Sequence, residues 1–134
     1  GISPIVKTSG DDSFYHIWDH SGKTDMIKNQ NEEVLMDYIE FCVSQINLFF
    51  SSVRSVLRKD LWTPDKNVEG RYLTTTFVNG IIGCLRRVIR HGMITDFEGY
   101  RDKFSGLDEF DFYKYKSSQY NQMGEDLYNE FIDK

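Results

Sequence analysis

A mainly α-helical bundle with one small β element is the fold that the sequence predicts, on three observations. Two long segments place apolar residues at spacings of three and four, which is the period of an amphipathic helix. Both segments begin at residues typical of helix N-termini. The composition is 40% hydrophobic and 15% aromatic, which suits a packed core. With 134 residues, we expect a single domain of residues 1–134.

The first element, residues 1–28, is expected to be a small β-hairpin or extended arm on a helical core of residues 29–134. Residues 2–19 alternate loosely between apolar and polar types, and the turn-rich stretch Thr8–Asp12 lies between two apolar groups. This arrangement is typical of two short strands joined by a turn.

The second element is a long helix over about residues 31–60. Asn31 is followed by two glutamates, and an acceptor plus negative charge suits the free N–H groups of a first turn. The apolar stripe continues to Leu57, before Trp62-Thr63-Pro64 breaks the pattern. At 1.5 Å per residue, about 28 residues would measure about 42 Å. We therefore expect either a central spine or a bend near Phe50-Ser51-Ser52.

The third element is a buried helix over about residues 74–91. Thr74 or Thr75 can cap its start, and Gly92 lies where a left-handed residue would end it. Gly80 and Gly83 each cost about 1 kcal/mol of helix propensity relative to Ala. We therefore expect these two glycines to allow close packing against another helix.

Two shorter helical segments complete the chain. Thr95-Asp96 is expected to cap an amphipathic piece that runs through Phe104. A C-terminal helix is expected over about residues 118–132, capped by Ser117 or Ser118.

Charge is strongly segregated along the chain. Residues 53–92 hold eight basic and three acidic residues, a net charge of +5, whereas the whole chain has a net charge of −5. If the long helix ends beside the 74–91 helix, five arginines would form one basic surface suited to phosphate or nucleic acid. These candidate binding residues are Arg54, Arg58, Arg86, Arg87 and Arg90.

A second interpretation of the same arginines stays open. Both groups lie in the last turns of predicted helices, where positive charge complements the helix dipole by about 0.3–1 kcal/mol. They are also available to pair with the acidic remainder of the chain. The overall acidity argues against a non-specific DNA-binding protein.

Catalytic and metal motifs are weak or missing. His16, Asp19 and His20 lie close in sequence, but their spacing serves a metal on a helix and this segment is read as extended. The chain contains no GxSxG, HExxH or GxGxxG. We expect no catalytic residues, no metal site and no cofactor within these residues.

The expected environment is the cytoplasm. Cys42 and Cys84 lie on predicted apolar helix faces without metal or redox spacing, which is typical of buried free thiols. Charged residues interrupt every apolar run well before the roughly 20 residues that span a bilayer. The chain begins with Gly1 instead of Met, so we expect a piece of a longer protein.

Two stretches resemble a known family. LTTTFVNGIIGCLRRVI, followed by the aromatic-rich FDFYKYKSSQYNQMGEDLYNEF, is similar to the C-terminal helical portion of bacterial DGQHR-domain proteins. The resemblance covers about residues 60–134 and implies a link to DNA modification or defence. The Asp-Gly-Gln-His-Arg motif of the family is absent here, so no functional residue carries over.

The sequence therefore favours a non-catalytic helical accessory or interaction domain of an intracellular bacterial protein. Its partner would be another protein or a domain of its parent protein, with no membrane involved and no oligomeric state indicated. A nucleic-acid-binding module that uses the arginine surface is the main alternative. Part of an enzyme whose active site lies in a missing domain is the third.

Overall fold

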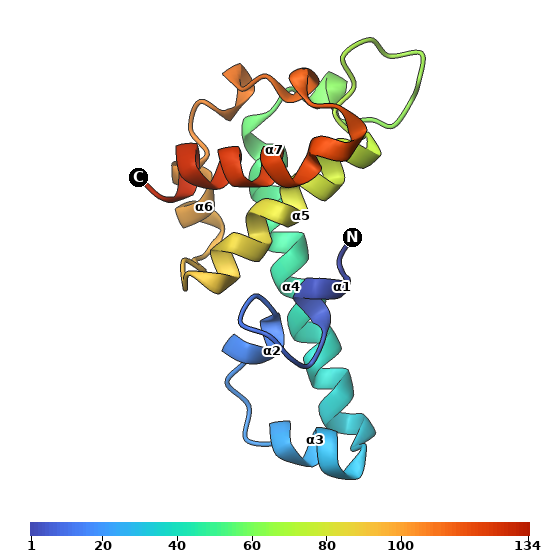
Figure 1. The fold of residues 1–134 in the computed structure, drawn as a ribbon, viewed down its shortest axis with the longest axis vertical. Coiled ribbons are helices and arrows are strands. Elements are labelled where there is room, and N and C mark those ends of the chain that lie inside the picture. The colour runs from blue at the N-terminus through green and yellow to red at the C-terminus, as the bar shows by residue number, and fades with distance from the viewer.

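The computed structural model describes residues 1–134 and is mainly helical, with 66% of the residues in helices and no strand. One long helix forms the spine, and two groups of shorter helices cover its two halves (Figure 1). The spine is α4 (Glu32–Val56). Its C-terminal half lies against the group α5 (Thr75–Arg90), α6 (Phe97–Lys103) and α7 (Tyr120–Leu127). Its N-terminal half carries α1 (Ser3–Val6), α2 (Phe14–Ile17) and α3 (Lys23–Asn29).

The predicted N-terminal β-hairpin is wrong, because this segment folds into α1, α2 and α3. Phe14 and Trp18 are four residues apart, so a helical turn points both toward α4, and both are buried. Ser13 starts α2 by accepting a hydrogen bond from the backbone N–H of Tyr15. Tyr38 of α4 donates a hydrogen bond of 2.8 Å to the carbonyl of Val6. Contacts with the spine therefore take the place of strand pairing.

The spine begins at the residue that the sequence indicates. The Asn31 side chain accepts hydrogen bonds from the N–H groups of Glu33 and Val34. The helix passes through Phe50-Ser51-Ser52 as one continuous element and ends at Val56, short of the expected residue 60. A 3-10 turn follows at Lys59–Leu61. No helix in the structure combines the length and apolar character that crossing a membrane requires.

Helix α5 has both of its expected ends. Thr74 accepts a hydrogen bond from the N–H of Phe77. At the other end Gly92 adopts a φ of 66°, and the N–H of Met93 reaches back to the carbonyl of Val88 at 2.9 Å. This arrangement satisfies carbonyl groups that the helix end would otherwise leave free.

Close packing of α5 against α7 depends on glycine, as the sequence predicts. A Cβ atom placed on Gly80 would lie 2.2 Å from the Met123 sulfur. A Cβ atom placed on Gly124 of α7 would lie 2.8 Å from the Gly83 carbonyl carbon and 3.0 Å from the backbone N of Cys84. The two backbones therefore touch at Gly83 and Gly124.

Aromatic contacts hold α6 against α4. Asp96 caps α6 through the N–H of Gly99, as expected. Phe49 of α4 packs edge-on against the rings of Tyr100 and Phe104.

The C-terminal helix is less regular than expected, since a 3-10 turn at Ser117–Gln119 precedes α7 and a wider π turn at Tyr128–Ile132 follows it. No serine side chain caps this helix; the side chain of Gln119 accepts from the N–H of Lys116 instead.

The glycine contact makes a matched pair of substitutions informative. Gly124→Ala should lower the free energy of unfolding by about 2 kcal/mol, because backbone atoms of α5 cannot move aside easily. Gly83→Ala should change it by less than about 1 kcal/mol, since its added Cβ meets only ordinary contacts and improves helix propensity. Urea denaturation followed by circular dichroism measures both. Equal effects of the two substitutions would contradict the packing described here.

Candidate functional site

Two of the five candidate arginines, Arg86 and Arg90, are bound to the same buried acidic residue. Both belong to α5 and converge on the carboxylate of Asp12, which is only 4% exposed. Arg86 donates to Asp12 through Nε, and Arg90 donates through Nη2 at 3.2 Å. Asp11 lies 4.0 Å from Arg90. The ion pairs fasten the segment before α2 to the C-terminal end of α5.

Arg58 lies near Tyr72, just before the start of α5, and Arg54 precedes Arg58 by four residues. The 3-10 turn after Arg58 is joined to the start of α5 by a hydrogen bond from the N–H of Tyr72 to the carbonyl of Leu61. Arg58 forms an exposed ion pair with Asp60 at 2.6 Å. Arg54 is exposed and has no ion-pair partner in the structure. Arg86 and Arg90 lie 11 and 15 positions after Thr75, the first residue of α5, which corresponds to about 17 and 23 Å along the helix.

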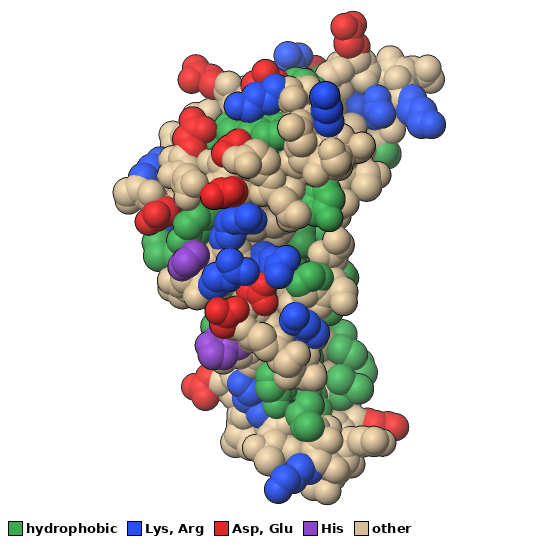
Figure 2. Space-filling model, viewed as in Figure 1, with side chains coloured by type: hydrophobic (Ala, Val, Ile, Leu, Met, Phe, Trp, Pro, Cys, Tyr) green, Lys and Arg blue, Asp and Glu red, His purple; other side chains and the backbone are tan.

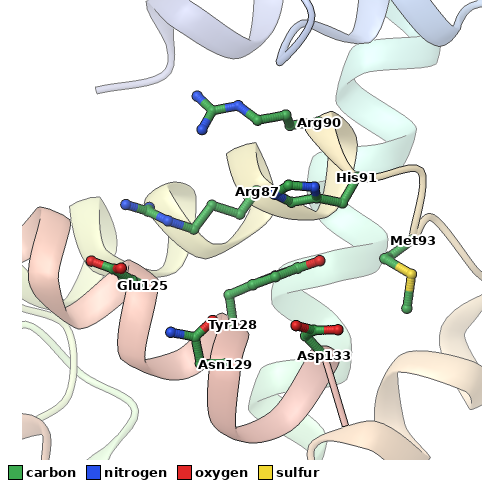
Figure 3. Close-up of a pocket in the computed structure, with 8 residues that line it drawn as sticks. All are labelled: Arg87, Arg90, His91, Met93, Glu125, Tyr128, Asn129 and Asp133. Carbon is green, nitrogen blue, oxygen red and sulfur yellow. The ribbon is translucent and has the colours of Figure 1, made fainter.

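Arg87 faces a hollow of about 530 Å³ between α5 and the C-terminal helix (Figure 3). Its guanidinium donates to the carbonyl of Gly83 at 2.9 Å and extends toward Glu125. His91 lies over the ring of Tyr128, with 5.3 Å between ring centroids. Asp133 lies below this ring, while Arg90 points away toward the N-terminal segment.

The charges around this end of α5 nearly balance. Burial alone would raise the pKa of Asp12, but hydrogen bonds and charge from Arg86 and Arg90 more than offset it and hold the pKa below its usual value. Glu125 and Asp133 add two carboxylates to the hollow that Arg87 lines. In the space-filling view, acidic side chains lie directly among the basic ones there (Figure 2). An incoming phosphate would therefore meet competing carboxylates.

The cysteines and His20 are placed in ways that do not suit a nucleophile or a metal site. Cys84 is fully buried, and burial raises the pKa of its thiol; Cys42 is also buried with a raised pKa. His20 shares a hydrogen bond of 3.1 Å with Asp37 of α4 and accepts one from the N–H of Gly22. No group of three His, Cys, Asp or Glu side chains is placed to hold a metal ion.

A surface that the sequence analysis did not single out lies along the N-terminal half of α4. Here the helix exposes large apolar side chains, including Met36 at 54% and Val43 at 51%. Val43 borders a hollow of about 380 Å³ between α4 and the N-terminal segment. Figure 2 shows green side chains on this flank of the lower half. We call this the α4 face; its hollow is lined by Ile2, Val6, Thr8, Leu35, Tyr38, Ile39, Cys42, Val43 and Ile46.

The sequence does contain a signal for this surface, because the apolar stripe of α4 is wider than a core-facing stripe needs to be. Tyr38, Cys42, Phe49 and Val53 are buried inside the chain, and these residues alone would make a complete core-facing stripe. Ile39, Val43 and their neighbours widen it toward solvent. Hydrophobic periodicity alone assigns both groups to the core, because it does not tell which side of a stripe is covered.

Comparison with family models, with curated proteins and with solved structures gave no match. The resemblance to DGQHR-domain proteins thus stays a prediction. The function must be argued from the surface itself.

The Asp12 ion pairs predict a stability that depends on pH. Asp12→Asn should lower the free energy of unfolding at pH 7 by about 1–3 kcal/mol, less than for a fully buried pair because both arginines are partly hydrated. Since the folded-state pKa of Asp12 is depressed, its contribution is complete above the unfolded pKa of about 3.9 and is lost as pH falls through the folded pKa. Wild type and variant should therefore converge at low pH.

Chemical denaturation at pH 7 and near pH 3 measures this difference. Asp11→Asn, at an aspartate whose side chain is 74% exposed, is the matched control and should have little effect at either pH. A difference between wild type and Asp12→Asn that stays constant with pH would contradict the ion-pair assignment.

Proposed function

We propose that this chain is a non-catalytic helical interaction domain that binds a protein partner through the α4 face. The observation that carries the proposal is the exposed apolar surface of α4, where Met36, Ile39 and Val43 are 42–54% exposed. Single exposed apolar side chains are ordinary, but contiguous groups of them on a folded protein mark interaction sites.

The shape and chemistry of the α4 face support a protein partner. Eight of the nine residues that line its hollow are hydrophobic, so the surface offers few groups for a polar ligand. The residues come from α4 and from the N-terminal segment around α1, which Tyr38 joins through its hydrogen bond to Val6. A preformed apolar surface on a regular helix suits an incoming helix, whose apolar residues anchor at spacings of three and four.

Nucleic-acid binding is the second candidate, and only the C-terminal end of α5 favours it. Arg87, Arg90 and His91 gather there at a helix terminus. Against it, Asp12 binds Arg90, and the carboxylates of Glu125 and Asp133 lie in the same hollow. Arg58 lies near Tyr72, before the opposite end of α5.

We expect neither duplex nor single-stranded DNA to bind at low salt, as measured by fluorescence anisotropy. Binding that falls linearly with salt in a log–log plot, and that Arg86→Ala with Arg87→Ala removes, would instead favour the nucleic-acid role. Lys28→Ala, an exposed residue on α3, is the control for general loss of charge.

The interaction role predicts position-specific cross-linking. A photoactivatable side chain at Val43 should give a discrete adduct in cells that express the chain, because this residue would be buried under the partner. The same group at Tyr113, which is 56% exposed on the opposite part of the molecule, should give none. A second substitution, Ile39→Glu, should remove the Val43 adduct. No adduct at Val43, or equal adducts at both positions, would contradict the proposal.

A further inference from the structure

We infer that the partner on the α4 face is a second copy of this chain, bound with its α4 antiparallel to the first. The inference rests on the proposed role of α4 as an interaction surface and names its occupant. Three features of α4 carry it: a second apolar seam, the charges along one flank of that seam, and the open space beside it.

The second seam repeats with the heptad spacing of a coiled coil. Its residues follow one another at intervals of three, four, three and four, the pattern of alternating a and d positions. The stripe buried inside the chain is a separate one, formed by residues such as Cys42 and Phe49. Helix α4 thus carries one stripe for its own core and one for a second helix. The residues of the seam are Met36, Ile39 and Val43, which are exposed, and Ile46 and Phe50, which are half-buried and also touch the core.

Charge along one flank of the seam selects the antiparallel orientation. Glu33, Glu40, Asn47 and Arg54 follow at seven-residue intervals on this flank, and all four are exposed. In an antiparallel pair, Val43 packs across Ile46 of the second copy. This register sets Glu33 opposite Arg54 of the second copy, and Glu40 opposite its Asn47.

The two-fold symmetry of such a pair makes each favourable contact occur twice. Glu33 and Arg54 lie 21 positions apart, about 31 Å along the helix, so their two ion pairs would close the two ends of the seam. A parallel pair would instead bring the acidic N-terminal end of one α4 beside the same acidic end of the second copy, and this repulsion is unfavourable. Opposite helix dipoles favour the antiparallel pair as well.

The space beside the seam is open to a helix. On the side of the Glu33–Arg54 flank, Glu40, Ser44, Asn47 and Ser51 are all exposed, so no element of the chain covers this line of α4. On the other side lies Ile2, the residue before α1, which is 48% exposed and extends the apolar surface. Helix α6 packs against α4 at another face, where Phe49 meets Tyr100 and Phe104.

A charge-reversal experiment tests the inference on the purified chain. Sedimentation equilibrium should show a dimer for wild type. Glu33→Arg and Arg54→Glu should each weaken it by about tenfold or more, because each reversal makes two facing pairs repulsive. Mixing the two variants should restore dimers, since all charges then pair with opposite charges across the interface. The double variant should also dimerise.

Controls separate assembly from folding. Glu69→Arg, at an exposed residue of the loop before α5, should leave the dimer unchanged. Val43→Glu should give a monomer, and circular dichroism should show that it keeps wild-type helicity. A wild-type chain that stays monomeric would overturn the inference, as would a dimer that both reversals leave intact or that mixing does not restore.

The mass of the Val43 photo-adduct separates this inference from the proposed function. An adduct of twice 15.8 kDa supports both. An adduct with a different protein, together with a monomeric purified chain, overturns the second-copy inference and leaves the interaction role standing. If no adduct forms, both are overturned.

Discussion

The length of α4 is the constraint on which the rest of the structure depends. Its 25 residues measure about 37 Å, more than one layer of short helices can cover. The chain therefore covers it in two separate parts, with α5, α6 and α7 over one half and α1, α2 and α3 along the other (Figure 1). The short N-terminal helices cover only part of their half, so an apolar flank stays exposed there.

The ion pairs at Asp12 connect the two parts. Arg86 and Arg90 extend from α5 to a carboxylate in the N-terminal segment, which is itself tied to α4 through Tyr38. The same contacts bear on whether the basic end of α5 can bind phosphate. Two of its arginines act within the fold as partners of a buried acid, and a phosphate would have to displace that acid. No group of the chain has to be displaced from the α4 face before a partner binds, so this face is the better candidate for a functional surface.

The parts that follow from local chemistry could be predicted from the sequence, and the parts that depend on distant contacts could not. Asn31, Thr74 and Gly92 mark helix ends because their side chains or φ angles satisfy nearby backbone groups. The N-terminal helices form because Phe14 and Trp18 are buried among residues of α4, and loose alternation does not reveal that contact. The separation of Arg54 from Arg90 depends on the path of the chain between α4 and α5. Exposure of the second seam likewise depends on which residues the other helices reach.

Methyl NMR spectra recorded over a dilution series test the central claim, that a second chain covers the exposed seam of α4. The methyl signals of Ile39, Val43 and Ile46 should shift on dilution from millimolar to micromolar concentration. Those of Ile81 and Val88, which are buried in α5, should not shift. If the seam signals do not move with concentration, or if the α5 signals move equally, the account of α4 as the surface that binds a second copy is contradicted.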